Sequence, residues 1–165
     1  MRLFEEKLYF CGKRLPQVQQ KYERKMKILI LNGPNLNRLG RREPEIYGTS
    51  SMQDCLDNLQ RQWADVEFAY EQSNCEGTLI DLLQSADDDG FDGVVFNAGA
   101  YTHTSVALHD CIRSLSVPVV EVHISNPQTR EEFRRHSFIT PVCKGVVAGF
   151  GLKSYELAVR ALLGE

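Results

Sequence analysis

The sequence predicts an α/β fold, with a five-stranded parallel sheet that carries helices on both faces. Two observations predict it. From residue 26 onward, short apolar runs and amphipathic segments alternate five times, and strands that alternate with helices form parallel sheets with crossover connections. The chain of 165 residues, 42% of them hydrophobic and 25% charged, also has the length and composition of one globular core. We therefore expect a single domain over residues 26–165.

The individual elements follow from hydrophobic periodicity and from the residues that begin and end helices. Short apolar or alternating runs predict strands over 26–31, 66–72, 93–96, 118–124 and 144–149. Helices are expected over 51–65, from Asn74 to Gly90, and over 104–115, 130–135 and 152–163. Ser51 and Asp54 resemble a capping box, Asn74 stands where it could cap the second helix, and Gly90 stands just after its expected end. Helix capping would account for Thr102 or Thr104.

Residues 1–25 differ from the rest in charge. They hold seven Lys or Arg against three Glu, a net charge of +4, which leaves −7 for residues 26–165 of the total of −3. Acidic residues interrupt the apolar run that a secretory signal needs. We expect this N-terminal extension to be poorly ordered and to have no role in chemistry, with a docking segment or an upstream start as alternatives.

Composition and cysteine usage exclude several classes of protein. The chain lacks the basic excess that is typical of nucleic-acid binding and lacks a run of about 18 apolar residues that could cross a membrane. Its five cysteines are odd in number and show no C-x-x-C spacing, which favours reduced thiols in a cytoplasmic protein. Cys55, Cys75 and Cys111 fit apolar helix faces rather than a nucleophile motif.

Polar residues follow three of the expected strands. They occupy 32–35, 97–103 and 121–126. Open α/β sheets bind small molecules beyond the carboxyl ends of their strands. Three polar clusters at one edge of the sheet therefore predict a binding or catalytic site there.

The segment 35–48 shows no helical or strand periodicity, which is typical of a functional lid or a disordered stretch. Arg38, Arg41 and Arg42 lie close in sequence to Tyr47. A neighbouring cation lowers the pKa of a phenol, so Tyr47 could serve as a general base. The alternative is a solvated arginine-rich loop in which Tyr47 is a packing anchor.

Glu121 and His123 stand two residues apart on an expected strand and so share one face. A carboxylate beside an imidazole fixes the ring and favours its charged form, which can donate a proton. The alternative is a structural histidine. Ile124 and Ser125 begin a strand-to-helix turn whose N–H groups could hold a carboxylate or phosphate, although an ordinary turn is the simpler interpretation.

Asn97 and His103 flank the loop before the third expected helix, and capping does not account for the histidine. The histidines match neither H-x-x-x-H nor H-E-x-x-H, so we expect no metal site. Gly149 and Gly151 are not part of G-x-G-x-x-G, and no P-loop is present, so we also expect no cofactor.

Four segments together resemble the type II 3-dehydroquinate dehydratases, or type II dehydroquinases, of the shikimate pathway. They are NGPNLNRLGRREP (32–44) with Tyr47-Gly48, NAGAYTHTS (97–105), EVHISN (121–126) and REEFRRHS (130–137). The resemblance covers about residues 26–165. It implies a flavodoxin-like form of the α/β fold and a hydro-lyase that needs neither a metal nor a Schiff base.

The resemblance implies an anti elimination of water from 3-dehydroquinate through an enolate. In this family pattern, Tyr47 is the base, Arg42 stabilises the tyrosinate, and Asn35 positions a water molecule at the enolate oxygen. His123 is the general acid. The residues that would set its orientation are Asn97 and Glu121.

The resemblance also implies substrate contacts and an assembly. Ile124 and Ser125 would hold the substrate carboxylate, and His103 and Arg134 would bind its ring hydroxyls. Asp110 would reach the site of a neighbouring subunit, with Arg130 organising that contact. The implied assembly is a homododecamer built from trimers, acting in aromatic amino acid biosynthesis or in quinate catabolism. The alternatives are a catalytically silent binding module for a small anionic metabolite and another lyase or isomerase of polyhydroxylated cyclic acids.

Overall fold

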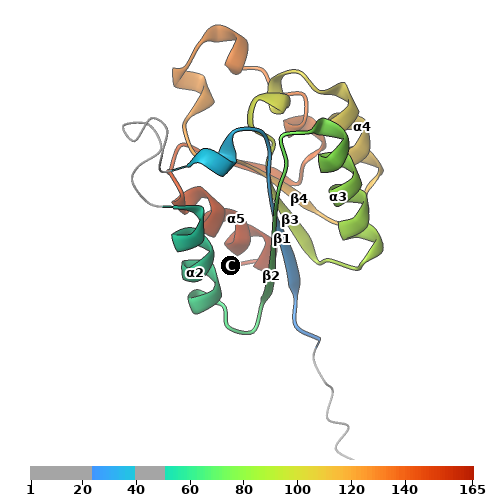
Figure 1. Cartoon of the computed structure of the whole chain (residues 1–165), viewed down its shortest axis with the longest axis vertical. Helices are drawn as coiled ribbons and strands as arrows, with labels where there is room; N and C mark the ends of the chain where they lie inside the picture. Colours follow the sequence, from blue (N-terminus) through green and yellow to red (C-terminus); the bar gives the residue numbers. More distant parts are fainter. Residues whose placement is uncertain (1–23, 40–50) are drawn as a thin grey trace, which may run out of the picture.

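The computed structural model describes residues 24–39 and 51–165. The predictions for the N-terminal extension up to residue 23, and those for Arg41, Arg42 and Tyr47, lie outside the described residues. Within these ranges, five parallel strands form one sheet in the order β2-β1-β3-β4-β5 (Figure 1). The strands are β1 Lys27–Asn32, β2 Glu67–Gln72, β3 Gly93–Asn97, β4 Val119–His123 and β5 Gly145–Ala148. The expected parallel sheet is confirmed.

Helices cover both faces of this sheet, as the sequence predicts (Figure 1). One face carries α2 Met52–Gln62 and α5 Lys153–Leu163, and the other carries α3 Glu76–Asp88 and α4 Val106–Ser114. Successive side chains of β1 point to opposite faces, so Ile28 and Ile30 pack toward α2 and α5 while Leu29 and Leu31 pack toward α3 and α4. Strand β1 is buried on both of its faces from Ile28 onward, which explains its unbroken apolar run.

The local signals at helix ends are confirmed in part. Ser51 and Asp54 form a capping box, with the Asp54 N–H donating to Ser51 Oγ at 3.1 Å and the Ser51 N–H donating to Asp54 Oδ2 at 2.9 Å. Gly90, at φ 68°, follows α3 as expected. The prediction that Asn74 caps α3 is wrong, because Cys75 is the N-cap and the Asn74 side chain is engaged elsewhere.

Two smaller expectations also need correction. Cys75 is exposed at the start of α3, whereas Cys55 and Cys111 lie on buried helix faces as expected. The N-cap of α4 is Ser105, which accepts the Leu108 N–H at 2.8 Å, so neither Thr102 nor Thr104 caps that helix. Among the described residues, no helix is both long enough and apolar enough to cross a membrane.

The connection from β4 to β5 differs most from the prediction. The helix expected over 130–135 is replaced by short 3-10 turns, and no α-helix forms between these strands. The turns are η3 Pro127–Thr129, η4 Glu132–Arg134 and η5 Thr140–Val142. Arg130 and Glu131 have extended backbone between η3 and η4, which leaves too few consecutive residues to nucleate an α-helix. We refer to residues 124–144 as the β4–β5 connection.

Candidate active site

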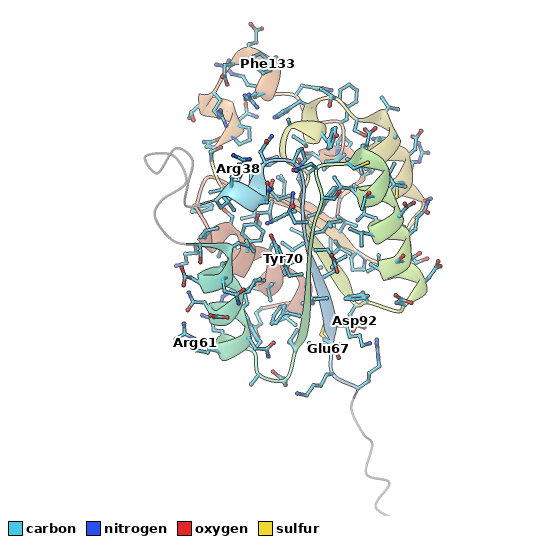
Figure 2. All side chains as sticks on the ribbon, in the orientation of Figure 1. Arg38, Arg61, Glu67, Tyr70, Asp92 and Phe133 are labelled. Carbon is cyan, nitrogen blue, oxygen red and sulfur yellow. The ribbon has the colours of Figure 1, made fainter. Side chains whose placement is uncertain are left out.

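A cavity of about 190 Å³ opens at the carboxyl ends of β1, β3 and β4. Figure 2 shows Arg38 of η1 (Leu36–Arg38) at this end of the molecule, together with Phe133 of the β4–β5 connection, while Glu67 and Asp92 mark the opposite end. The lining residues are Pro34, Asn35, Leu36, Arg38, Leu39, Asn97, Gly99, Ala100, His103, His123, Ile124, Ser125, Pro127, Arg130 and Arg134. The cavity lies where the strand-end rule places a ligand site.

Most of the predicted site residues that the structure describes meet at this cavity. They are Asn35, Asn97, His103, His123, Ile124, Ser125 and Arg134. Glu121 is fully buried and contacts His123, which lines the cavity. Asp110 is exposed on α4 and does not line the cavity, and Arg42 and Tyr47 lie outside the described residues.

The end of β1 is shaped by a close approach to β3. The Gly33 N–H donates to the carbonyl of Asn97 at 2.7 Å, and a Cβ at Gly33 would lie 2.5 Å from the carbonyl oxygen of Ala98. Only glycine fits there. Asn35 then adopts a left-handed conformation at φ 68°, which asparagine tolerates better than most residues. Its N–H donates to Asn74 Oδ1 at 2.9 Å, which secures the turn at the cavity edge.

His123 and Glu121 form a hydrogen-bonded pair at the end of β4. His123 Nε2 lies 2.7 Å from Glu121 Oε1, and the side chains are 12% and 0% exposed. Burial by itself would raise the pKa of Glu121, but hydrogen bonds from His123, Thr102 and Thr140 outweigh it and lower that pKa. Because an ionised carboxylate only accepts hydrogen bonds, Nε2 donates to Glu121, and this contact fixes the imidazole at the wall of the cavity.

His103 faces the cavity in a different state. Its Nδ1 lies 2.7 Å from the carbonyl oxygen of His136, and because a carbonyl only accepts, Nδ1 donates there and Nε2 is the acceptor of a neutral ring. Burial lowers the pKa of His103, and the charges of His123 and Arg134 lower it further. The His103 and His123 rings are nearly parallel, with centroids 6.4 Å apart. A neutral His103 can accept a hydrogen bond from a hydroxyl group of a ligand.

The turn after β4 presents two backbone donors beside the cavity. Among the described residues, no group accepts the N–H of Ile124 or of Ser125, although the Ile124 carbonyl accepts the Gly151 N–H at 3.0 Å. Gly149, at φ 91°, lets the chain after β5 pass this turn, where a Cβ would lie 3.2 Å from Asn126 Cβ. The turn therefore has the donors that an anion needs.

Cationic side chains surround the same cavity. Arg38, Arg130 and Arg134 all line it. Arg134 Nε donates to Glu131 Oε2 at 2.9 Å, and Arg130 Nε lies 3.6 Å from the same oxygen. The positive potential of these groups favours an anionic ligand.

Asn97 is held from below by a residue that the sequence analysis did not identify. Asn97 Nδ2 donates to Tyr155 Oη at 3.0 Å, and Tyr155 Oη donates to Asn32 Oδ1 at 2.7 Å. The Gly99 N–H donates to Asn97 Oδ1 at 3.2 Å, so both ends of the amide are fixed. Tyr155 lies in the apolar stripe of α5, and that position alone does not distinguish it from an ordinary core residue.

Comparison with known proteins gives the same family as the sequence motifs. The family model described as dehydroquinase class II matches residues 26–163. The chain is 53% identical over 140 residues to the 3-dehydroquinate dehydratase of Pelodictyon phaeoclathratiforme, which covers 84% of this chain and 93% of that protein. It is 56% identical over 137 residues to that of Rhizobium etli, covering 82% and 94%.

Solved structures agree. The type II dehydroquinase of Butyrivibrio crossotus superposes with a TM-score of 0.81 and 46% identity, covering 84% of this chain and 97% of that one. The type II dehydroquinase of Propionibacterium acnes gives a TM-score of 0.79 and 42% identity, with the same coverage. The flavodoxin-like fold that the resemblance implies is therefore confirmed, and the chain belongs to the dehydroquinase class II family.

Proposed function

We propose that this protein is a 3-dehydroquinate dehydratase, a hydro-lyase that removes water from 3-dehydroquinate to form 3-dehydroshikimate. The observation that carries the proposal is the buried His123–Glu121 pair, which opens onto a cavity lined by cations and by backbone donors. Family membership supplies the substrate, because the relatives bear the name of this reaction.

The cavity groups match the chemical features of a polyhydroxylated cyclic acid. The N–H groups of Ile124 and Ser125 would hold the carboxylate, as backbone donors at such turns hold anions. The neutral His103 would accept a hydrogen bond from one ring hydroxyl, and Arg134 would donate to another. The site would then select a substrate whose carboxylate and ring hydroxyls are spaced to reach these protein groups at the same time.

The elimination would proceed in two steps. Tyr47, ionised beside Arg42, would take the proton next to the carbonyl, and the electron pair of that C–H bond would move to the carbonyl oxygen to form an enolate. Asn35, which lines the same cavity as His123, would position a water molecule that stabilises the enolate oxygen. The enolate would then collapse, the C–O bond would break, and His123 would donate its proton so that water leaves.

Glu121 would keep the acid ready for the second step. Its ionised carboxylate lies 2.7 Å from His123 Nε2 and stabilises the imidazolium before the proton is transferred. Asn97 contributes a fixed amide at the cavity floor. Its orienting effect on His123 would act through the shape of the cavity, because its hydrogen bonds go to Tyr155 and Gly99.

Asp110 would act between subunits. It is exposed on α4 and outside the cavity of its own chain, as a residue that completes a neighbouring site would be. The proposal includes a homododecamer built from trimers, which light scattering on the full chain tests directly. We further propose a cytoplasmic enzyme of the shikimate pathway. Quinate catabolism would use identical chemistry.

The reaction can be followed by the ultraviolet absorbance of the conjugated product. Purified protein mixed with 3-dehydroquinate should produce this absorbance, and Tyr47→Phe should lower kcat by about 10²–10⁴-fold because the base is lost, while ligand binding survives. Tyr101→Phe is the matched control, since that hydroxyl donates to the Asn74 carbonyl at 3.0 Å and has no role in the proposal.

Two outcomes would overturn the proposal. Near-normal turnover by Tyr47→Phe would contradict the assigned base. Tight binding of 3-dehydroquinate by the unsubstituted protein with no change in absorbance would instead favour a catalytically silent binding module.

A further inference from the structure

Within residues 24–39 and 51–165, the carboxylate of Glu121 has three side-chain partners besides His123. Ser137 Oγ lies 3.1 Å from Glu121 Oε1 and 3.4 Å from Oε2. Thr102 Oγ1 donates to Oε1, and Thr140 Oγ1 donates to Oε2. We call Thr102, Ser137 and Thr140 the hydroxyl cage.

The direction of these hydrogen bonds follows from the groups involved. An ionised carboxylate only accepts, so the hydroxyl groups donate to it. Ser137 Oγ itself accepts the N–H groups of Ile139 at 3.2 Å and Thr140 at 3.0 Å, which leaves its own proton to point toward Glu121 or toward Thr102 Oγ1, 2.9 Å away. Thr102 and Thr140 therefore donate their hydroxyl protons to the Glu121 carboxylate. Ser137 donates either to that carboxylate or to the Thr102 hydroxyl, which itself donates to it.

The cage joins two separate parts of the chain. Thr102 belongs to η2 Gly99–His103, whereas Ser137 and Thr140 belong to the β4–β5 connection. The Phe138 N–H donates to the Thr102 carbonyl at 2.8 Å, next to the cage. Arg130 and Arg134, which line the cavity, lie on the same connection. Through the hydroxyl cage, the β4–β5 connection, which carries Arg130 and Arg134, is hydrogen-bonded to Glu121, the partner of His123.

A buried carboxylate needs such donors to remain charged. Removal from water disfavours the ionised form, and donors to that form restore it. The titratable groups that face Glu121 in the described part of the chain are His123 on β4, His103 on η2 and Cys143 after η5. Burial raises the pKa of Cys143 to about 12, so this thiol stays neutral and the two imidazoles are the groups whose charge can change.

We propose that Thr102, Ser137 and Thr140 are positioning residues for the dehydration: their hydroxyls hold Glu121 ionised and directed at His123, and Ser137 and Thr140 also seat the β4–β5 connection over the cavity. The proposal rests on the proposed function of His123 as the acid. None of the three hydroxyls touches the reacting atoms, so they act through Glu121.

The test replaces Thr140 with a residue of the same shape. Thr140→Val should lower kcat about ten-fold with a smaller change in KM, because one hydrogen bond to a charged group is lost. The acid side of the kcat profile should move to higher pH, since a carboxylate with fewer donors binds a proton more readily and then no longer supports the imidazolium. Thr140→Ser, which keeps the hydroxyl, should restore both properties.

Thr129→Val is the matched control on the same connection. The Thr129 hydroxyl donates to the Asn126 carbonyl at 3.0 Å and not to Glu121, so this variant should keep the profile of the unsubstituted protein. Ser137→Ala, which removes the longest contacts of the cage, should shift the profile in the same direction by less than Thr140→Val. If Thr140→Val does not fold, Ser137→Ala provides the test of the cage in its place.

A second readout does not depend on turnover. In protein labelled with ¹³C at glutamate carboxyl carbons, the Glu121 signal, identified by its loss in Glu121→Gln, should titrate at higher pH in Thr140→Val than in the unsubstituted protein. An unchanged titration and an unchanged pH profile in Thr140→Val would overturn the proposal, as would an equal shift in Thr129→Val. A protein inactive toward 3-dehydroquinate that nevertheless shows the shifted titration would refute the proposed function and leave the cage supported.

Discussion

Two buried polar networks lie under the same cavity and differ in charge. Beneath the end of β4, Glu121 is ionised and gathers His123 and the hydroxyl cage. Beneath the ends of β1 and β3, Tyr155 bridges two neutral amides, Asn32 and Asn97. The centre of each network is shielded from water, since Glu121, Asn32 and Tyr155 are fully buried.

This difference in charge suggests different functions: the Glu121 network would take part in proton transfer, and the Tyr155 network would hold residues in position. Burial holds the pKa of Tyr155 well above its ordinary value, so the phenol stays neutral and the network of Tyr155, Asn32 and Asn97 carries no charge near neutral pH. The charged network contains the ionised carboxylate of Glu121 and the imidazole that we propose as the acid. We therefore expect substitutions in the charged network to alter pH dependence, and substitutions in the neutral network to alter stability and rate without altering pH dependence.

The largest effect should come from removing the acid. His123→Ala should lower kcat by about 10²–10⁴-fold, because no other group would protonate the departing hydroxyl. Absorbance assays across pH measure this loss. His109→Ala is the control: its Nδ1 lies 2.8 Å from the Phe138 carbonyl, outside both networks, and it should keep most activity. Equal losses in the two variants would mean that any histidine substitution disturbs the fold.

Removing the charge of Glu121 should have the next largest effect. Glu121→Gln keeps the size of the side chain but places an amide NH₂ among groups that donate, so one of these contacts becomes unfavourable. We expect a loss of roughly 3–5 kcal/mol in the free energy of unfolding, as when one partner of a buried pair is removed, together with a large drop in kcat. Urea denaturation and steady-state kinetics measure both. Unchanged stability would show that the carboxylate is not ionised in the folded protein.

Tyr155→Phe makes the corresponding change in the neutral network. It removes one hydroxyl and leaves Asn97 Nδ2 and Asn32 Oδ1 without that partner, which should cost about 1–3 kcal/mol of unfolding free energy. We expect a moderate fall in kcat with no movement of the pH profile. A displaced profile in this variant would end the distinction between the two networks.

The pH dependence of stability should show the same contrast. Glu121 has an ordinary pKa of 4.5 that is lowered in the folded protein, so its stabilising contribution is present above that value and is lost as pH falls below it toward the folded pKa. On acidification, the unfolding free energy of Glu121→Gln should therefore fall less than that of the unsubstituted protein. The unfolding free energy of Tyr155→Phe should fall by the same amount as that of the unsubstituted protein. Urea denaturation at a series of acidic pH values makes the comparison, and identical slopes for all three proteins would contradict it.

The smallest expected effect is that of a chelator. Among the described residues, no group of three or more His, Cys, Asp or Glu side chains is placed to hold a metal ion. EDTA should leave turnover unchanged, because both networks act through protons and hydrogen bonds. Loss of activity that added divalent metal restores would refute the proposed mechanism.

Much of the fold is predictable from local patterns. The apolar run of β1 and the alternation of strands with helices indicate a parallel sheet covered on both faces, because each apolar face must be buried. The capping box at Ser51 is also predictable, because its two partners, Ser51 and Asp54, lie within one helical turn. The β4–β5 connection is not, because its 3-10 turns are held by contacts with residues remote in sequence.

The candidate site likewise has features that the sequence predicts and features that it does not. The pairing of Glu121 with His123 follows from a spacing of two residues on a strand, and the strand-end rule predicts that Asn35, Asn97 and Ser125 share one cavity. The roles of Tyr47 and Arg42 stay predictions, since these residues lie outside the described part of the chain.

The sequence by itself therefore determined the sheet, the Glu121–His123 pair and the end of the sheet at which the cavity lies, because these depend on periodicity and on neighbours along the chain. Only the tertiary structure decided which groups keep Glu121 charged and Asn97 oriented. Ser137 lies 16 residues from Glu121, Thr102 and Thr140 each lie 19 residues away, and Tyr155 lies 123 residues from Asn32. No local pattern encodes such contacts; they form when the burial of apolar faces brings distant polar groups together.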